Sequence, residues 1–338
     1  MSAYDVDIGM LMNGKRELQG TGRYYCCTPN KTIYEIDSYE DNNGILINAS
    51  NMEDALYEFC VSALKQYREE DNNHDVYTFS LNIDTYHGSC TVYINNTESL
   101  LNSIQEALPY EKIRQKANTS QSDQDLYNNL LNDYQFSESD YGFIFDEWPE
   151  RLQKYLGIYA CISMEQPEWL NIDQTYMVEQ SLLDSQLFLL AINVLNRLQS
   201  ELSKLHRTDR FIAYVSAADG VGGDFLTTSH LIRKCLTNEQ LYAAMPDVKL
   251  LDDAYETSLQ TITTLSIQEQ VQHWTAVLER GEFHPGSPYQ YSKTDYEVYE
   301  QLLFLGEPAI AFINEQLNNR LKSDTAFILK AVISDLES

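Results

Sequence analysis

Residues 76–96 have the sequence VYTFSLNIDTYHGSCTVYINN, and this stretch decides the fold class of the chain. Apolar and polar side chains alternate over residues 77–83, and they alternate again over residues 90–94. An alternation with a period of two is typical of a strand with one buried face. Because the loop Asp84–Ser89 separates the two runs, the stretch predicts an antiparallel hairpin.

Helical patterns lie on both sides of this hairpin. Ser50-Asn51-Met52-Glu53 matches a capping box, and residues 52–67 then place their apolar side chains on one helical stripe. Asn96-Thr97 would open a second helix that continues through Ile104. A longer apolar pattern predicts a helix from Val178 to Leu205, buried on two sides in its first half.

Further strand signals flank these helices. Residues 1–49 are β-rich, because two strand-like runs surround a predicted turn at Thr28–Lys31. Tyr159–Ser163 and Phe211–Ala217 are two more strand-like runs. The stretch 109–150 is polar and weakly periodic, which predicts loops and short helices over the sheet.

The C-terminal part loses strand signals and predicts helices only, the last two starting at Gly306 and near Ala326. The fold we expect is α+β, an antiparallel sheet flanked by helices, followed by an all-helical segment. The expected domains are residues 1–250, with a β hairpin in 1–49 and a core in 50–250, and residues 251–338. We expect their boundary near 248–258.

The chain is strongly acidic. It has 23 Lys and Arg residues against 51 Asp and Glu residues, a net charge of −28. The acids come in blocks, and no Lys or Arg lies between Lys116 and Arg151. Nucleic acids and anionic membranes are bound through Lys and Arg, so we expect neither as a ligand. A field of one sign attracts partners of the other, so the expected partner is a basic protein.

Tyr, Phe and Trp interleave with the acids over residues 127–159. Two interpretations are open: the aromatic residues anchor a long loop onto the domain, or they bind a partner. The candidate partner-binding residues are Asp133, Tyr134, Glu138, Asp140, Tyr141, Asp146, Glu147 and Trp148.

Catalytic and metal-binding patterns are weak. A Gly-rich stretch, residues 219–224, follows a predicted strand, but it lacks the Lys-Ser/Thr of a P-loop and the GxGxxG spacing. The six His form no HExxH motif, and Cys90 and Cys235 lie on apolar faces, as core thiols do. Adjacent acids such as Asp252-Asp253 are expected on a solvated face. We therefore predict no catalytic residue, metal or cofactor.

The six cysteines are scattered without a CxxC pair, which is typical of a reducing cytosol. Residues 1–10 have no basic and apolar regions of a signal peptide, and no apolar run approaches the roughly 20 residues that span a bilayer. The expected location is the cytoplasm.

An order of features links residues 50–250 to a known family. In sequence these are the first helix, Val76–Leu81, Asn95-Asn96-Thr97-Glu98, the acidic segment around Asp146-Glu147-Trp148, the Leu-rich helix, Phe211–Ser216 with Asp219, and Leu236-Thr237-Asn238. In this order the chain resembles the bacterial family called domain of unknown function 4303. It departs from that pattern in an acidic insert at 109–140 and in its terminal segments. Leu305–Ile310 is similar to the end unit of helical-hairpin repeats.

Members of this family are similar in size and setting to the small proteins of bacterial toxin–immunity loci. The resemblance therefore suggests that role. We therefore expect a non-enzymatic immunity protein that neutralises a basic, nuclease-like toxin. One alternative is a metal-dependent enzyme that uses residues 219–224. Another is a structural module that docks into a larger assembly through its C-terminal helices. The identity of the partner and the oligomeric state stay open.

Overall fold

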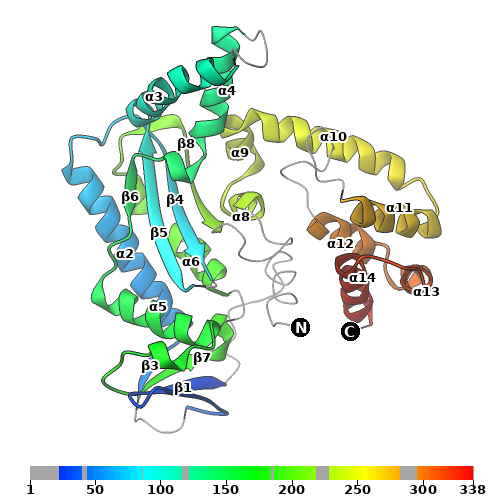
Figure 1. Ribbon diagram of the computed structural model, residues 1–338, viewed down its shortest axis with the longest axis horizontal. Helices are drawn as coiled ribbons and strands as arrows, with labels where there is room; N and C mark the ends of the chain where they lie inside the picture. The colour runs from blue at the N-terminus through cyan, green and yellow to red at the C-terminus, as the bar shows by residue number, and fades with distance from the viewer. Residues whose placement is uncertain are drawn as a thin grey trace. The chain divides into compact units, whose positions relative to one another are not determined.

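The structure, a computed structural model, describes residues 23–39, 44–85, 87–115, 122–183, 186–217, 228–281 and 295–337. The chain divides into two compact units. The α+β unit contains the described residues of 17–221 and 234–240, and the helical unit contains those of 222–233 and 241–338. The predicted α+β class is confirmed, since two sheets flanked by helices are followed by a helical part (Figure 1).

The larger sheet of the α+β unit, which we call the central sheet, has the strand order β6-β5-β4-β8. Its strands are β4 (Val76–Asp84), β5 (Ser89–Asn96), β6 (Phe143–Phe145) and β8 (Arg207–Ala217). The predicted hairpin is confirmed as the antiparallel pair β4–β5. β8 runs parallel to β4, so the sheet is mixed and the expectation of a purely antiparallel sheet is wrong. β6 also runs parallel to β4, so the residues between β6 and β8 form the crossover that a parallel return requires.

One face of the central sheet is apolar and carries helices. Phe79 and Leu81 on β4 are fully buried. The helix α6 (Gln186–Arg197) packs on β4 and β8, and α2 (Ala49–Glu69) packs against α6. Tyr67 of α2 meets the ring of Phe143 edge-on, at 5.0 Å between centroids. The apolar half of the strand alternation is therefore the core of this unit.

The opposite face of the central sheet is polar, and a β-bulge adds one residue to it. The β4–β5 register shifts between Val76 and Thr78. This bulge takes Tyr77 out of the predicted alternation, and its ring packs edge-on against Phe136 and Tyr141. A bulge places two residues opposite one and so re-aims a side chain.

A second sheet has the order β2-β1-β7-β3. Its strands are β1 (Tyr24–Thr28), β2 (Thr32–Ile36), β3 (Ile45–Ile47) and β7 (Tyr176–Glu179). The predicted hairpin β1–β2 is confirmed, and its turn is closed by a hydrogen bond from the Lys31 amide to the Thr28 carbonyl at 2.9 Å. β7 pairs with β1 in the antiparallel sense and with β3 in the parallel sense.

Two helix predictions and one strand prediction need adjustment. The helix α2 is confirmed, but its N-cap is Asn48, which accepts a hydrogen bond from the Asn51 amide at 2.9 Å. The strand expected at Tyr159–Ser163 is wrong, since this run ends the helix α5 (Glu150–Ser163). The helix expected from Val178 instead begins as β7, followed by η3 (Gln180–Leu183), α6 and α7 (Gln199–Leu202).

The polar stretch after β5 is more helical than its sequence predicts. The helices α3 (Thr97–Gln115) and α4 (Asp123–Gln135) pack against each other. Their buried apolar cluster consists of Tyr77, Leu100, Ile104, Leu126 and Leu130. The short η2 (Pro167–Trp169) follows α5. Helix pairs of this kind need only a narrow apolar stripe, which a polar sequence can hide.

The helical unit confirms the prediction of helices at the C-terminal end. In chain order the remaining helices are α8 (Thr228–Cys235), α9 (Asn238–Ala244), α10 (Pro246–Ile262), α11 (Ile267–Arg280), α12 (Asp295–Phe304), η4 (Glu307–Ala309), α13 (Ile310–Leu317) and α14 (Ser323–Leu336). The helices α11 to α14 pack together, with Trp274 in their core. The boundary expected at 248–258 falls inside α10. Among the described helices, none is both long and apolar enough to cross a membrane.

Candidate partner-binding surface

The predicted partner-binding residues lie on one segment between the end of α4 and the start of α5. The segment passes through η1 (Glu138–Asp140) and β6, an edge strand of the central sheet, and reaches Trp148. The structure separates these residues into two groups. One group is built into the domain, and the other faces solvent.

Glu138 belongs to the first group. Its carboxylate accepts hydrogen bonds from the Ser80 hydroxyl and, at 2.9 Å, from the Asn82 amide. The Ser216 hydroxyl lies 3.1 Å from that of Ser80 and accepts a second hydrogen bond from Asn82 at 2.9 Å. Because hydrogen bonds to a carboxylate are strong, this polar cluster ties η1 to the polar face of the central sheet.

Asp140 and Tyr141 also have partners inside the domain. The Asp140 carboxylate accepts a hydrogen bond from the Ser137 hydroxyl at 2.5 Å. Tyr141 is only 4% exposed, and its hydroxyl lies 3.1 Å from that of Tyr214. Burial raises the pKa of both phenols well above their ordinary value, so both stay neutral. Tyr141 is therefore a core residue of the segment.

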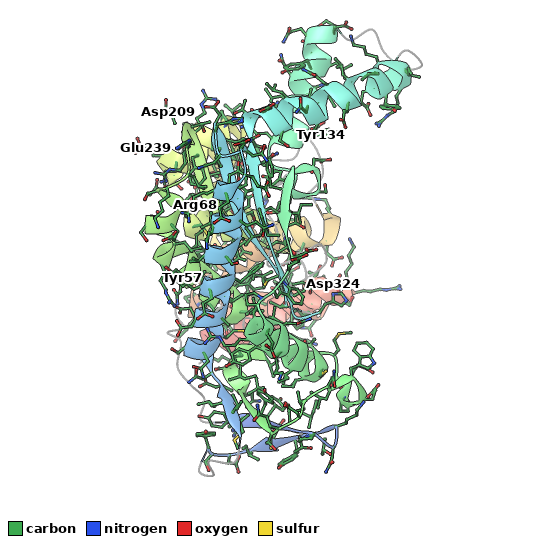
Figure 2. All side chains as sticks on the ribbon, turned by 90° about the vertical axis from the view of Figure 1, so that its left-hand side faces the viewer. Tyr57, Arg68, Tyr134, Asp209, Glu239 and Asp324 are labelled. Atoms are coloured by element: carbon green, nitrogen blue, oxygen red, sulfur yellow. The ribbon has the colours of Figure 1, made fainter. Side chains whose placement is uncertain are left out.

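Tyr134 and Trp148 are half-buried. Tyr134, near the end of α4, packs against the α3–α4 cluster (Figure 2). The Trp148 indole donates a hydrogen bond to the Cys90 carbonyl at 2.7 Å. Of the two interpretations of the aromatic residues, these contacts favour the one in which they anchor the segment onto the domain.

Asp133, Asp146 and Glu147 form the second group, since their side chains are exposed. Asp146 and Glu147 directly follow β6, whose Ile144 side chain is 52% exposed. One side of a groove of about 130 Å³ consists of Ile144, Phe145, Asp146 and Glu147, and we call this groove the β6 groove. Its other wall belongs to α2 and consists of Phe59, Ser62, Ala63 and Gln66.

The β6 groove combines an apolar floor with an acidic end. Phe59, Ala63 and Phe145 are buried, whereas Asp146 and Glu147 face solvent. None of the residues that line this groove is Lys or Arg. An apolar anchor site beside exposed carboxylates suits an aliphatic side chain flanked by cations.

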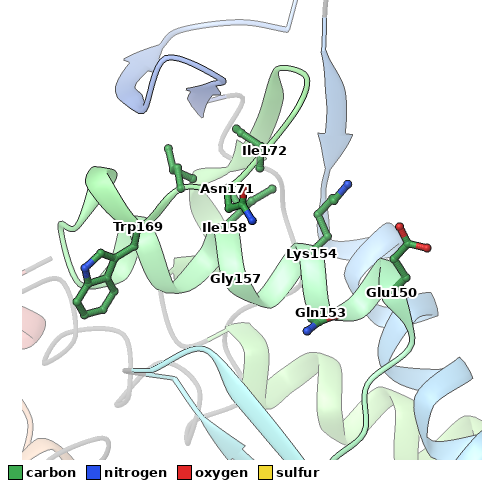
Figure 3. A pocket seen from close by; sticks show the side chains of 9 residues that line it. Glu150, Gln153, Lys154, Gly157, Ile158, Trp169, Asn171 and Ile172 are labelled. Atoms are coloured by element: carbon green, nitrogen blue, oxygen red, sulfur yellow. The ribbon is translucent and has the colours of Figure 1, made fainter.

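A second cavity, of about 380 Å³, lies between α5 and residues 169–172 (Figure 3). The Trp169 side chain at one end is 58% exposed. Lys154 lines the cavity with its ammonium 3.6 Å from Asp173, and Tyr176 and Asp173 raise its pKa above the ordinary value. Glu150 and Lys154 both line this cavity, so its lining has no excess of acids, and it suits a basic partner less well than the β6 groove does.

Five of the six cysteines are buried, and Cys235 is half-buried. All six are free, and Cys90 is fully buried. Burial raises the pKa of Cys90 well above the ordinary value and that of Cys235 to about 11. Because the thiolate is the nucleophile, a raised pKa keeps both thiols mainly protonated and less nucleophilic at neutral pH.

The other catalytic candidates are separated or lie outside the described residues. Asp252 is buried, and its carboxylate accepts two hydrogen bonds from Arg233, at 2.8 and 3.0 Å. The expectation that it lies on a solvated face is therefore wrong. Asp253 pairs with Lys249 at 2.6 Å, so the two neighbouring acids have different partners. Within the described ranges, no three His, Cys, Asp or Glu side chains gather to hold a metal. The Gly-rich stretch 219–224 lies outside these ranges.

No protein-family model, curated protein or solved structure matches this chain. The resemblance to domain of unknown function 4303 therefore stays a prediction.

Sequence analysis missed two parts of this surface. Ser80 and Asn82 appeared only as the polar half of a strand alternation, and that alternation is the signal that could have found them. Ser216 lay in the apolar strand-like run Phe211–Ala217 and had no such signal. The α2 side of the β6 groove had no signal, because Phe59 and Ala63 belong to the stripe that forms the core and Ser62 and Gln66 are polar residues common on any helix.

Proposed function

We propose that this chain is a non-enzymatic, acidic protein that binds a basic protein partner. The observation that carries the proposal is the β6 groove, where Asp146 and Glu147 face solvent beside an apolar floor. Burial of an anchor side chain in such a groove supplies affinity, and exposed carboxylates steer a cationic partner toward it.

The partner we propose is a nuclease-like bacterial toxin, and the role is that of a cytosolic immunity protein. A nuclease binds the phosphates of nucleic acid through Lys and Arg. A chain with a net charge of −28 complements that basic surface and, when bound there, blocks the access of nucleic acid to the nuclease. The resemblance to domain of unknown function 4303 supports this role. Free cysteines, which are typical of reducing compartments, support the cytosolic location.

Co-expression with the product of the adjacent gene tests the immunity role. We expect that product to be basic and to stop growth when it is expressed alone. Co-expression of the wild-type chain should restore growth, and co-expression of the double variant Asp146→Lys/Glu147→Lys should not. Restored growth with this variant, or an adjacent product that does not affect growth, would contradict the proposal.

A metal-dependent enzyme is the second candidate, and one observation favours it. The parallel strands β4 and β8 end at the same edge of the central sheet, and β8 ends at Ala217, shortly before residues 219–224 in the sequence. Ligands of open α/β sheets bind beyond such carboxyl ends. At this edge the His87 ring Nδ1 lies 2.7 Å from the Asp84 carboxylate.

Thermal melting with Mg²⁺ and Mn²⁺ separates the two candidates. If residues 219–224 form only a turn, neither ion should change the melting temperature of the wild type or of the double variant Asp219→Asn/Asp224→Asn. A ligand that binds only the native state raises its stability by mass action. A metal-dependent rise in the wild type that is lost in the variant would favour the enzyme.

A further inference from the structure

We propose that the basic partner adds an extended segment to the free edge of β6, an inference that rests on the proposed function. β6 is the terminal strand of the central sheet, and within the described residues it pairs with β5 alone. Alternate N–H and C=O groups of an edge strand point away from the sheet and can pair with another chain. Extended peptides bind many proteins in this way.

The β6 groove provides the side-chain pocket that such binding needs. A strand laid beside β6 directs every second side chain toward α2, where Phe59 and Ala63 form the floor. The volume of about 130 Å³ is of the size that holds one aliphatic or small aromatic group. Ser62 and Gln66 on α2 add polar groups to the rim.

Charge complementarity identifies the occupant. Asp146 and Glu147 are exposed at the end of β6, and the nearby cation of Arg151 is already 2.9 Å from the Glu58 carboxylate. An extended segment with an aliphatic residue between Lys or Arg residues therefore fits both the floor and the acidic end. A second copy of this chain fits poorly, because pairing two β6 edges would bring like charges together.

A short peptide in which Lys alternates with Val is the probe. Titration of the full chain with this peptide should protect those amides within Phe143–Phe145 that point away from β5 from hydrogen exchange by about tenfold or more, as new strand pairing requires. Ile144→Lys places a cation on the edge and should weaken peptide binding by about tenfold or more. The matched control is Ile113→Lys, since Ile113 on α3 is also exposed, at 71%, and should leave binding unchanged.

A second peptide with the same charges, N-methylated at alternate backbone amides, separates strand addition from simple charge attraction. We expect it to bind more weakly by about tenfold or more, because the methyl groups block the ladder hydrogen bonds. Equal binding of both peptides would overturn strand addition but leave the basic-partner proposal standing. Binding of neither peptide would overturn strand addition as well, and protection of Phe143–Phe145 by self-association without peptide would identify a second copy as the occupant and overturn it too.

Discussion

The double variant Asp146→Lys/Glu147→Lys is expected to associate with its basic partner about tenfold more slowly, or slower still, at low ionic strength. Exposed charges at an interface act mainly on the association rate. Both carboxylates are solvent-exposed, so the fold should tolerate their replacement. The dissociation rate should change less, because it depends on the buried anchor. Stopped-flow kinetics of the purified complex measures both rates.

The matched control for this variant is Glu35→Lys/Asp37→Lys, which changes two exposed acids at β2 and the loop after it. Both double variants shift the net charge by the same amount, from −28 to −24, since each reversal adds two charges. The control should lose much less of the association rate. Equal losses in the two variants would show that only the total charge matters and would contradict a specific surface.

The largest effect on stability is expected from Gly88→Ala. Gly88 lies in the β4–β5 turn with φ +61°, and an added Cβ would lie 2.9 Å from both the Leu156 carbonyl oxygen and Tyr159 Cδ1. A left-handed backbone costs other residues about 1–2 kcal/mol, and overpacking costs about 1–3 kcal/mol. We therefore expect the free energy of unfolding to fall by roughly 2–5 kcal/mol.

Gly157→Ala, in the middle of α5, is the matched control. A Cβ at this position would meet nothing within 4 Å, so Ala should stabilise the helix by about 0.5–1 kcal/mol. Urea unfolding of the two variants measures these opposite changes. A stable Gly88→Ala variant would mean that the hairpin does not rest against α5 as the structure has it.

The sequence predicts elements whose pattern is local and strong. The β4–β5 hairpin and α2 follow from strict alternation and from one helical stripe, and both are confirmed. The parallel pairing of β8 with β4 is not local, because the residues that pair, such as Phe79 and Ala213, are far apart in the chain. The run Tyr159–Ser163 is apolar and short, and a short apolar run does not distinguish a strand from a helix end.

The site was only partly predictable for a similar reason. The density of acids and aromatic residues identified the right segment, but not which side chains face solvent. Glu138 is held by Ser80, 58 positions earlier, so its reversal to Lys would damage the fold rather than report on binding. Asp146 and Glu147 are exposed because the chain leaves the sheet after β6, a fact that only the register with β5 reveals.

The dependence of the association rate on ionic strength tests the central claim most directly. A partner steered by the carboxylates around the β6 groove should associate much more slowly as salt rises, while its dissociation rate stays nearly constant. The Asp146→Lys/Glu147→Lys variant should show a clearly shallower dependence on salt than the wild type. An association rate that is indifferent to salt in both proteins would contradict recognition through this acidic surface.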